Sequence, residues 1–269
     1  MKRILKFTSG LLILLAIAVF TQRSRIMDLV VEWQKPTVEA VPFQETVTAP
    51  SEQRAQVKQE TTQAPAEKTP EPASAPTSSL PSEYNLAIPF TSQAPLGVWD
   101  AVHEQTCEEA SVFMVAQYFQ QKPAGLISAN GAEEELQRII KFEDALFGYN
   151  EDTTASETAL VIENYENLST ELVMNPTKDQ IEQALVAGFP VIVPAAGQQL
   201  GNPYFKTPGP LYHMLVVKGY TAEGFITNDP GTRHGADYVY PFETLLAANH
   251  DWNGGDVTLG DRVMIIVKP

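Results

Sequence analysis

The chain has 269 residues, 43% of them hydrophobic, one cysteine and a formal net charge of −15. An acidic protein is repelled by the phosphates of nucleic acids and by anionic membrane surfaces, so its folded part is expected to bind neither. A single cysteine cannot form an intramolecular disulfide or a thiolate metal cluster, so the fold must be held by a hydrophobic core.

The N-terminal segment, residues 1–33, is typical of an export signal or a membrane anchor. Lys2, Arg3 and Lys6 precede an uninterrupted apolar run of 11 residues, 10–20. Such a run is short for a membrane-spanning helix, and its positive flank is typical of a signal. We expect this segment to tether the chain to the membrane, or to be cleaved inefficiently, with the rest of the protein outside the cytoplasm.

Composition changes over residues 34–83, where Pro, Ala, Thr, Glu, Gln and Ser dominate and aromatic residues are nearly absent. A segment of this kind buries too little apolar surface to offset the entropy lost on ordering. We therefore expect a disordered, fairly extended linker between the N-terminal segment and a folded domain.

Residues 84–269 are long enough for one domain with its own core, and they hold 9 basic and 24 acidic side chains. The patterns of apolar and turn residues predict most of its helices before most of its strands, which favours an α+β fold with a mostly antiparallel C-terminal sheet. The predicted helices span 106–120, 131–146, 154–164 with Ser156 as cap, 177–187 and 241–248, and the predicted strands span 86–90, 169–174, 190–195, 213–220, 224–228 and 263–268.

The only cysteine, Cys107, comes at the start of the first predicted helix, directly after Thr106 as a possible N-cap. The free amides and dipole of a helix N-terminus favour a thiolate, which is how nucleophilic cysteines are often presented. Burial as a small apolar residue is the alternative. Because Glu104, Glu108 and Glu109 oppose ionisation of the thiol, a catalytic Cys107 requires a base from elsewhere in the chain.

A possible base lies on the predicted hairpin of 213–220 and 224–228. His213 opens its first strand and Asp229 follows its second, so an antiparallel pairing brings them together at the open end. A carboxylate beside an imidazole fixes its tautomer and stabilises the imidazolium. The alternative is a strand-end histidine followed by an ordinary Asp-Pro-Gly turn.

Four short motifs, taken together and in order, resemble the peptidase C39-like family. They are Ile-Pro-Phe-Thr-Ser-Gln-Ala-Pro at 88–95, Cys-Glu-Glu-Ala-Ser at 107–111, Tyr-His-Met-Leu-Val-Val-Lys-Gly-Tyr at 212–220, and Asn-Asp-Pro at 228–230. Members of this family are papain-fold cysteine peptidases related to the peptidase domains of bacteriocin-exporting transporters. The resemblance implies a helical N-terminal part whose nucleophile helix packs on the sheet.

The same resemblance implies roles for individual residues. Cys107 is then the nucleophile, His213 the general base and acid, and Asp229 the residue that orients the imidazole. The family also uses an upstream glutamine in its oxyanion hole, which matches Gln93, with Gln105 as second choice because it is nearer the cysteine. No cofactor or metal is implied, and the expected partner is a peptide or protein substrate.

One departure from the family pattern keeps other functions open. Glu108 and Glu109 follow the cysteine where many relatives carry Gly-Pro or Gly-Leu. A peptide-binding or cell-envelope-binding module without hydrolysis, and an amide-exchanging transferase, are therefore alternatives to an extracytoplasmic peptidase. A zinc site formed by His213, Asp229 and His234 is a further, less favoured alternative.

Overall fold

A seven-stranded sheet organises the computed structural model, which describes residues 35–44 and 80–269. The strand order is β2-β7-β3-β4-β5-β6, with β1 also paired to β4, and every strand pairing is antiparallel. The strands are β1 (Tyr84–Asn85), β2 (Ser169–Met174), β3 (Val191–Ala196), β4 (Tyr212–Tyr220), β5 (Phe225–Asn228), β6 (Tyr238–Tyr240) and β7 (Val263–Lys268). The predicted α+β class is confirmed.

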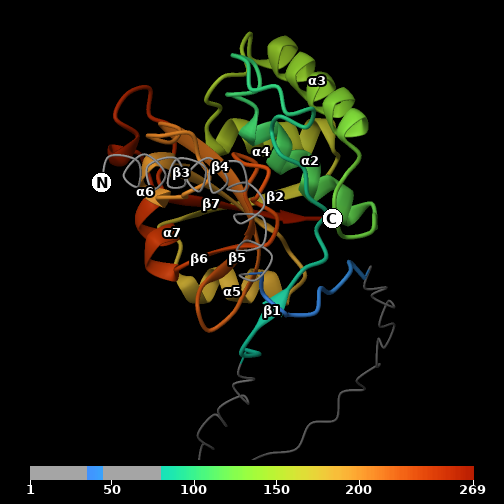
Figure 1. Cartoon of the computed structure of the whole chain (residues 1–269), viewed down its shortest axis with the longest axis vertical. Helices are drawn as coiled ribbons and strands as arrows, with labels where there is room; N and C mark the ends of the chain where they lie inside the picture. The colour runs from blue at the N-terminus through green and yellow to red at the C-terminus, as the bar shows by residue number, and fades with distance from the viewer. Residues whose placement is uncertain (1–34, 45–79) are drawn as a thin grey trace, which may run out of the picture.

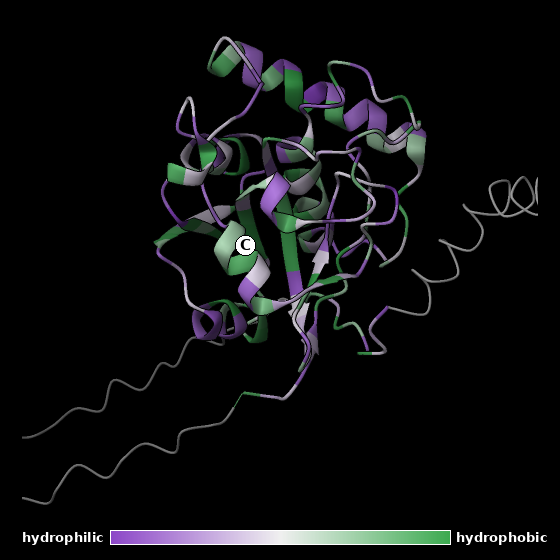
Figure 2. Cartoon of the chain, turned by 60° about the vertical axis from the view of Figure 1, so that its left-hand side comes forward, coloured by the Kyte–Doolittle hydropathy of each residue, from purple (hydrophilic) through white to green (hydrophobic). Residues whose placement is uncertain are grey.

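The two central strands, β3 and β4, are buried along their whole length, and each has a neighbouring strand on both sides. Both strands accordingly contain an uninterrupted apolar stretch, residues 191–196 in β3 and 214–217 in β4. In Figure 2 the strands at the centre of the molecule are largely green, the colour of hydrophobic residues. β4 carries His213, which pairs in register with Ala195 of β3, so the rigid middle of the sheet holds this side chain.

The helices gather mainly beside the sheet rather than within its plane. They are α2 (Cys107–Phe119), α3 (Ala129–Leu146), α4 (Ala155–Tyr165), α5 (Lys178–Val186), α6 (Gly197–Leu200) and α7 (Phe242–Ala248), with a 3₁₀ turn at Val257–Leu259. Figure 1 shows α2, α3 and α4 together at one side of the sheet, with α5 and α7 beyond its other side. α2 contacts β4 as well as α3 and α4, which explains why 11 of its 13 residues are buried.

Capping side chains fix the starts of three helices. Ser128 accepts from the backbone of Gly131 at the start of α3, and Thr154 and Thr177 form capping boxes at α4 and α5. The predicted Ser156 cap is wrong, because Thr154 occupies that position. Thr106 precedes α2 as predicted, but its hydroxyl donates to backbone carbonyls and caps no amide of the helix.

Several short elements differ from the sequence prediction. The first strand comprises Tyr84–Asn85 and not residues 86–90, of which only Leu86 and Phe90 form isolated bridges. β1 reaches β4 at Gly219, where a Cβ atom would lie 2.3 Å from the Tyr84 carbonyl oxygen. α6, β6 and the 3₁₀ turn were not predicted, since three or four residues carry too little periodicity to be recognised.

Part of the predicted linker lies on the domain. Val41 bridges Leu86, its amide donating to the Asn85 carbonyl while its carbonyl accepts from Ala87, both at 2.8 Å. The blue segment in Figure 1 accordingly lies beside the start of the domain. Residues 1–33, predicted as signal or anchor, lie outside the described residues, among which no helix is long and apolar enough to cross a membrane.

Candidate functional site

Cys107 is the first residue of α2, as predicted, and only 4% of it is exposed. Its Sγ donates a hydrogen bond to Oε2 of Glu108 at 3.0 Å. Burial, followed by the charge of Glu108, raises the pKa of the thiol well above its usual value, while the backbone N–H of Met214 acts in the opposite direction. The predicted effect of the neighbouring glutamates on the thiol therefore has the expected sign.

His213 and Asp229 meet at the open end of the β4–β5 hairpin. Nε2 of His213 lies 2.7 Å from Oδ1 of Asp229, and both side chains are almost completely buried. Burial alone would raise the pKa of Asp229, but the charge of His213 and hydrogen bonds from three residues hold it below its usual value. An ionised Asp229 that accepts from Nε2 leaves Nδ1 as the ring nitrogen that can take a proton.

Asp229 has three further hydrogen-bond donors, two of which sequence reasoning missed. Tyr240 donates to Oδ2 at 2.5 Å and Asn202 at 3.1 Å, while the Gly231 amide donates to Oδ1 at 2.9 Å. Asn202 follows α6 and Tyr240 ends β6, two elements that were not predicted, and neither residue belongs to a local motif. Gly231 also lies under the imidazole, where a Cβ would be 2.9 Å from a ring carbon of His213.

The start of α2 packs against β4 beside His213. Oγ of Ser111 donates to the carbonyl of Cys107 at 2.8 Å and lies 3.3 Å from the carbonyl of Met214, the residue after His213. The Met214 amide is also close enough to influence the thiol. Among the described residues, however, no hydrogen bond joins the Cys107 sulfur to the His213 ring, because the sulfur faces Glu108.

Gln93 connects the two halves of the site through its backbone. Its amide donates to the carbonyl of Pro230, directly after Asp229, and its carbonyl accepts from the hydroxyl of Thr106, directly before Cys107; both distances are 2.9 Å. The side-chain Nε2 donates to the carbonyl of His103 at 2.7 Å, so one of its two N–H bonds remains for another acceptor.

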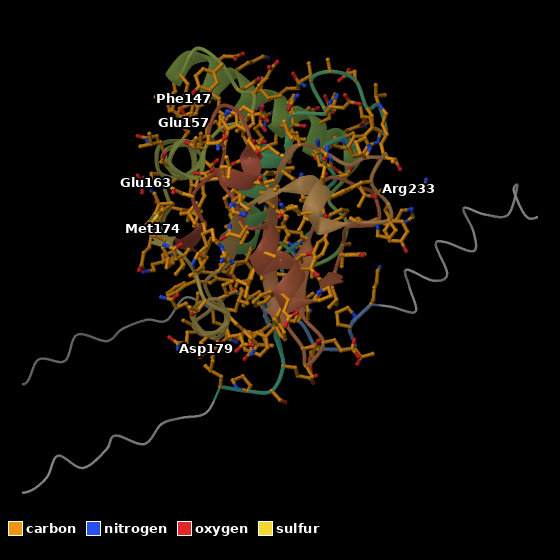
Figure 3. All side chains as sticks on the ribbon, turned by 90° about the vertical axis from the view of Figure 1, so that its left-hand side faces the viewer. Phe147, Glu157, Glu163, Met174, Asp179 and Arg233 are labelled. Atoms are coloured by element: carbon orange, nitrogen blue, oxygen red, sulfur yellow. The ribbon has the colours of Figure 1, made fainter. Side chains whose placement is uncertain are left out.

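A groove of about 1000 Å³ opens beside these residues. Gln93, Gln105 and Gly231 all line this groove, so both glutamines considered for the oxyanion hole face the same space. Figure 3 labels Arg233, another lining residue, on the side of the molecule away from Glu157 and Met174. Other lining residues include Trp99, Glu104 and the loop 204–210.

A family model described as "Peptidase_C39 like family" matches residues 85–254, which is more than half of the chain. The chain belongs to the peptidase C39-like family. It is thus a cysteine peptidase, and the family resemblance predicted from the sequence is confirmed.

The chain was also compared with solved structures and with curated proteins. A solved structure from Bacillus anthracis, described as a candidate C39-like peptidase, is 16% identical to this C39-like peptidase; the match covers 70% of this chain and 98% of the other, with a TM-score of 0.46. No curated protein matches the chain.

His103 and His234 of the C39-like domain have different contacts from His213. His103 lies on the loop before Cys107, with Nδ1 2.7 Å from Asp100 and Nε2 2.9 Å from Glu133, so both of its ring nitrogens are engaged. Phe205 packs edge-on against His213, whereas His234 packs against Tyr204. No group of three or more potential metal ligands occurs among residues 35–44 and 80–269.

Proposed function

We propose that this C39-like peptidase cleaves peptide bonds with Cys107 as nucleophile, His213 as general base and acid, and Asp229 as the orienting carboxylate. The observation that carries the proposal is the buried His213–Asp229 pair at 2.7 Å. It keeps Nε2 as the donor to Asp229 and Nδ1 as an acceptor. The base is then on β4, against which the start of α2 packs, and Cys107 is the first residue of that helix.

The proposed reaction begins with transfer of the thiol proton to Nδ1 of His213. The thiolate of Cys107 attacks the peptide carbonyl, and the oxyanion accepts hydrogen bonds from the remaining Nε2–H of Gln93 and the backbone N–H of Cys107. The tetrahedral intermediate collapses when His213 returns the proton to the leaving amine. Water, deprotonated by His213, then hydrolyses the thioester and restores the thiol.

The proposed substrate is a peptide or protein segment that lies in the groove. Trp99, Tyr204 and Phe205 line the groove and provide aromatic surface for apolar side chains. The negative charge of the domain favours binding of a neutral or basic peptide and disfavours binding of nucleic acid.

The proposed location is outside the cytoplasm, with membrane attachment through the N-terminal segment alone. The support is the basic and apolar pattern of residues 2–20, followed by the Pro- and Ala-rich stretch up to the domain. Selective labelling of intact cells with a reagent that does not enter the cytoplasm tests this placement: an unlabelled protein would contradict it.

The catalytic proposal predicts that His213→Ala abolishes most hydrolysis. Removal of a general base typically lowers the rate by about 10²- to 10⁴-fold. Cleavage of a mixed peptide pool, followed by mass spectrometry, measures the loss, and Cys107→Ser should remove cleavage as well. The matched control is His250→Ala, since His250 bonds the carbonyl of Gly260 away from the groove.

Alkylation by iodoacetamide gives a second readout of the same proposal. His213 should accelerate the reaction of Cys107, so His213→Ala should slow it, whereas His250→Ala should not. Equal alkylation rates in the wild type and His213→Ala, with intact peptide hydrolysis in both, would remove His213 from the mechanism.

A peptide-binding module on the same scaffold is the second candidate function. The buried sulfur and its hydrogen bond to Glu108 favour it, because they keep the thiol protonated. A binding module would hold a peptide with unchanged affinity after Cys107→Ser and would form no acyl-enzyme detectable by mass spectrometry. A trapped thioester on Cys107 would exclude this candidate.

A further inference from the structure

Glu108 contacts the nucleophile directly, although the proposed reaction gives it no role. Its Oε2 accepts the thiol hydrogen bond of Cys107 at 3.0 Å, and only 1% of the residue is exposed. Its other carboxyl oxygen, Oε1, is buried and has no hydrogen-bond partner among the described residues. A buried carboxyl group with an open hydrogen-bonding site is costly for the fold, so its position against the sulfur calls for an explanation.

The carboxyl groups of other acidic residues lie near Glu108. Among the described residues, no lysine, arginine or histidine forms a hydrogen bond or ion pair with Glu108 or with the carboxyl groups near it. Burial raises the pKa of Glu108 to about 8, and the charges of Glu143 and Asp152 add to this effect. The titratable groups that face it or surround it are Cys107 and Glu109 of α2, Glu143 of α3, Asp152 before α4, Tyr212 of β4, and Asp251, which bonds the Tyr212 hydroxyl.

A thiol that is hydrogen-bonded to Glu108 is not ready to attack a carbonyl group. The thiol carries its proton, and its hydrogen bond is directed to a carboxyl group rather than to Nδ1 of His213. The Cys107 side chain has one rotatable bond, Cα–Cβ, so rotation about it can exchange the two partners. Gln93 lines the groove, and its carbonyl accepts a hydrogen bond from the hydroxyl of Thr106, directly before Cys107. Substrate that binds at Gln93 therefore lies near the N-terminal end of α2.

We propose that Glu108 is a positioning residue that holds the Cys107 thiol in a resting, protonated state until substrate binding turns the sulfur to His213. This inference rests on the proposed catalytic function. In the activating step the hydrogen bond to Glu108 breaks, the S–H bond breaks, and the proton moves to Nδ1 of His213. The products are the thiolate and the imidazolium, so charge and protons balance without any further reactant.

The test compares Glu108→Gln with Glu109→Gln in the otherwise intact protein. Both changes replace a buried carboxyl group by an uncharged amide of the same size, but only Glu108 touches the sulfur. A glutamine carries no charge and its amide can donate to a thiolate. Above about pH 8, where Glu108 is ionised, Glu108→Gln should therefore increase iodoacetamide alkylation of Cys107 by about tenfold, equivalent to a thiol pKa about one unit lower. Glu109→Gln should change the rate by less than about threefold.

The pH dependence of peptide hydrolysis provides the second readout. The acid limb of kcat/KM should move about one pH unit lower in Glu108→Gln, with little change in the plateau value, because the thiol is deprotonated more readily without the charge of Glu108. A structural role alone would change stability and leave this profile in place. Equal alkylation rates in the two variants, or a loss of kcat at every pH in Glu108→Gln, would overturn the proposal, the latter by making Glu108 part of the proton transfer.

The two proposals fail in distinguishable ways. If the wild type hydrolyses no peptide, the catalytic proposal fails, while the difference in alkylation between the two variants still reports the effect of Glu108 on the thiol. If the wild type hydrolyses peptides and the variants are alkylated at the same rate, only the role of Glu108 is lost.

Discussion

Asp229 is a buried carboxylate whose four hydrogen bonds come from four separate places in the chain. His213 and the Gly231 amide bond one oxygen, and Tyr240 and Asn202 bond the other. A carboxylate with several donors remains ionised even when it is buried. This arrangement fixes the orientation of the carboxylate, and through it the orientation of the imidazole that it holds.

The residue-scale prediction concerns Tyr240. Tyr240→Phe removes the shortest hydrogen bond to Oδ2 and leaves the weaker one from Asn202. We expect a loss of about 1 kcal/mol in the free energy of unfolding and a decrease in kcat/KM of roughly threefold to tenfold, because His213 is oriented less firmly. Peptide hydrolysis and urea denaturation measure the two effects.

Tyr238→Phe is the matched control, since Tyr238 lies two residues earlier on β6 and packs against the Tyr240 ring. Its hydroxyl makes no hydrogen bond among the described residues, so kcat/KM should stay within about twofold of the wild type. Identical activity in the two variants would show that Tyr240 does not support Asp229.

At the scale of elements, α2 and α3 pack with carboxyl groups between them. Glu109 of α2 and Glu143 of α3 are 0% and 1% exposed, and their carboxyl groups lie close enough for a hydrogen bond when one of them is protonated. Burial, together with the charge of Glu143, raises the pKa of Glu109, and burial raises the pKa of Glu143 to about 7. The interface between these helices is therefore most favourable when the carboxyl groups are protonated.

This interface makes stability depend on pH. The folded state binds more protons than the unfolded chain at pH values above the usual glutamate pKa of 4.5, so stability should fall as pH rises through the raised pKa of Glu143, about 7. Glu143→Gln should remove part of the slope and stabilise the protein at about pH 8 by roughly 1–3 kcal/mol, with little effect at about pH 4. Urea denaturation at the two pH values measures the difference.

Glu134→Gln is the control on the same helix. Its side chain is 71% exposed and forms only a loose ion pair with Arg138, so stability should change by less than about 0.5 kcal/mol at either pH. The same pH slope in Glu143→Gln as in the wild type would refute the assignment of the slope to the buried carboxyl groups.

At the scale of the whole molecule, a short segment of the predicted linker, around Val41 and Phe43, packs against the domain. Val41 pairs with the chain next to β1, and the ring of Phe43 packs edge-on against Tyr118 and Phe119 with centroids 5.6 and 4.9 Å away. These aromatic residues end α2, so the segment covers the end of the helix opposite to Cys107. The contact extends the domain by residues that composition assigns to a spacer.

This contact predicts that Phe43→Ala destabilises the domain. Loss of a half-buried aromatic ring with two edge-to-face partners should lower the free energy of unfolding by about 1–3 kcal/mol. Chemical denaturation measures the loss, with Gln44→Ala, an exposed neighbour, as the control. Equal stability of both variants would mean that the segment does not support the fold. Peptidase activity at low temperature should persist, since Phe43 is outside the site.

The sequence by itself determined the features that depend on neighbouring residues. Helix periodicity and hairpin spacing were enough to put Cys107 at the first position of a helix and to place His213 near Asp229, where the structure gives a distance of 2.7 Å. The sequence also indicated the family and the sign of the effect of Glu108 on the thiol. Local dihedral preferences, strand pairing and charge act over a few residues, so they can be inferred from the order of residues alone.

Only the tertiary structure decided which distant groups meet. Asn202 and Tyr240 reach Asp229 from separate elements, Glu143 faces Glu109 across two helices, and Phe43 reaches α2 from the predicted linker. It also decided that the Cys107 sulfur rests against Glu108 instead of His213. Such contacts depend on how helices and strands pack in three dimensions, and on whether water is excluded there, and neither is encoded in a local pattern.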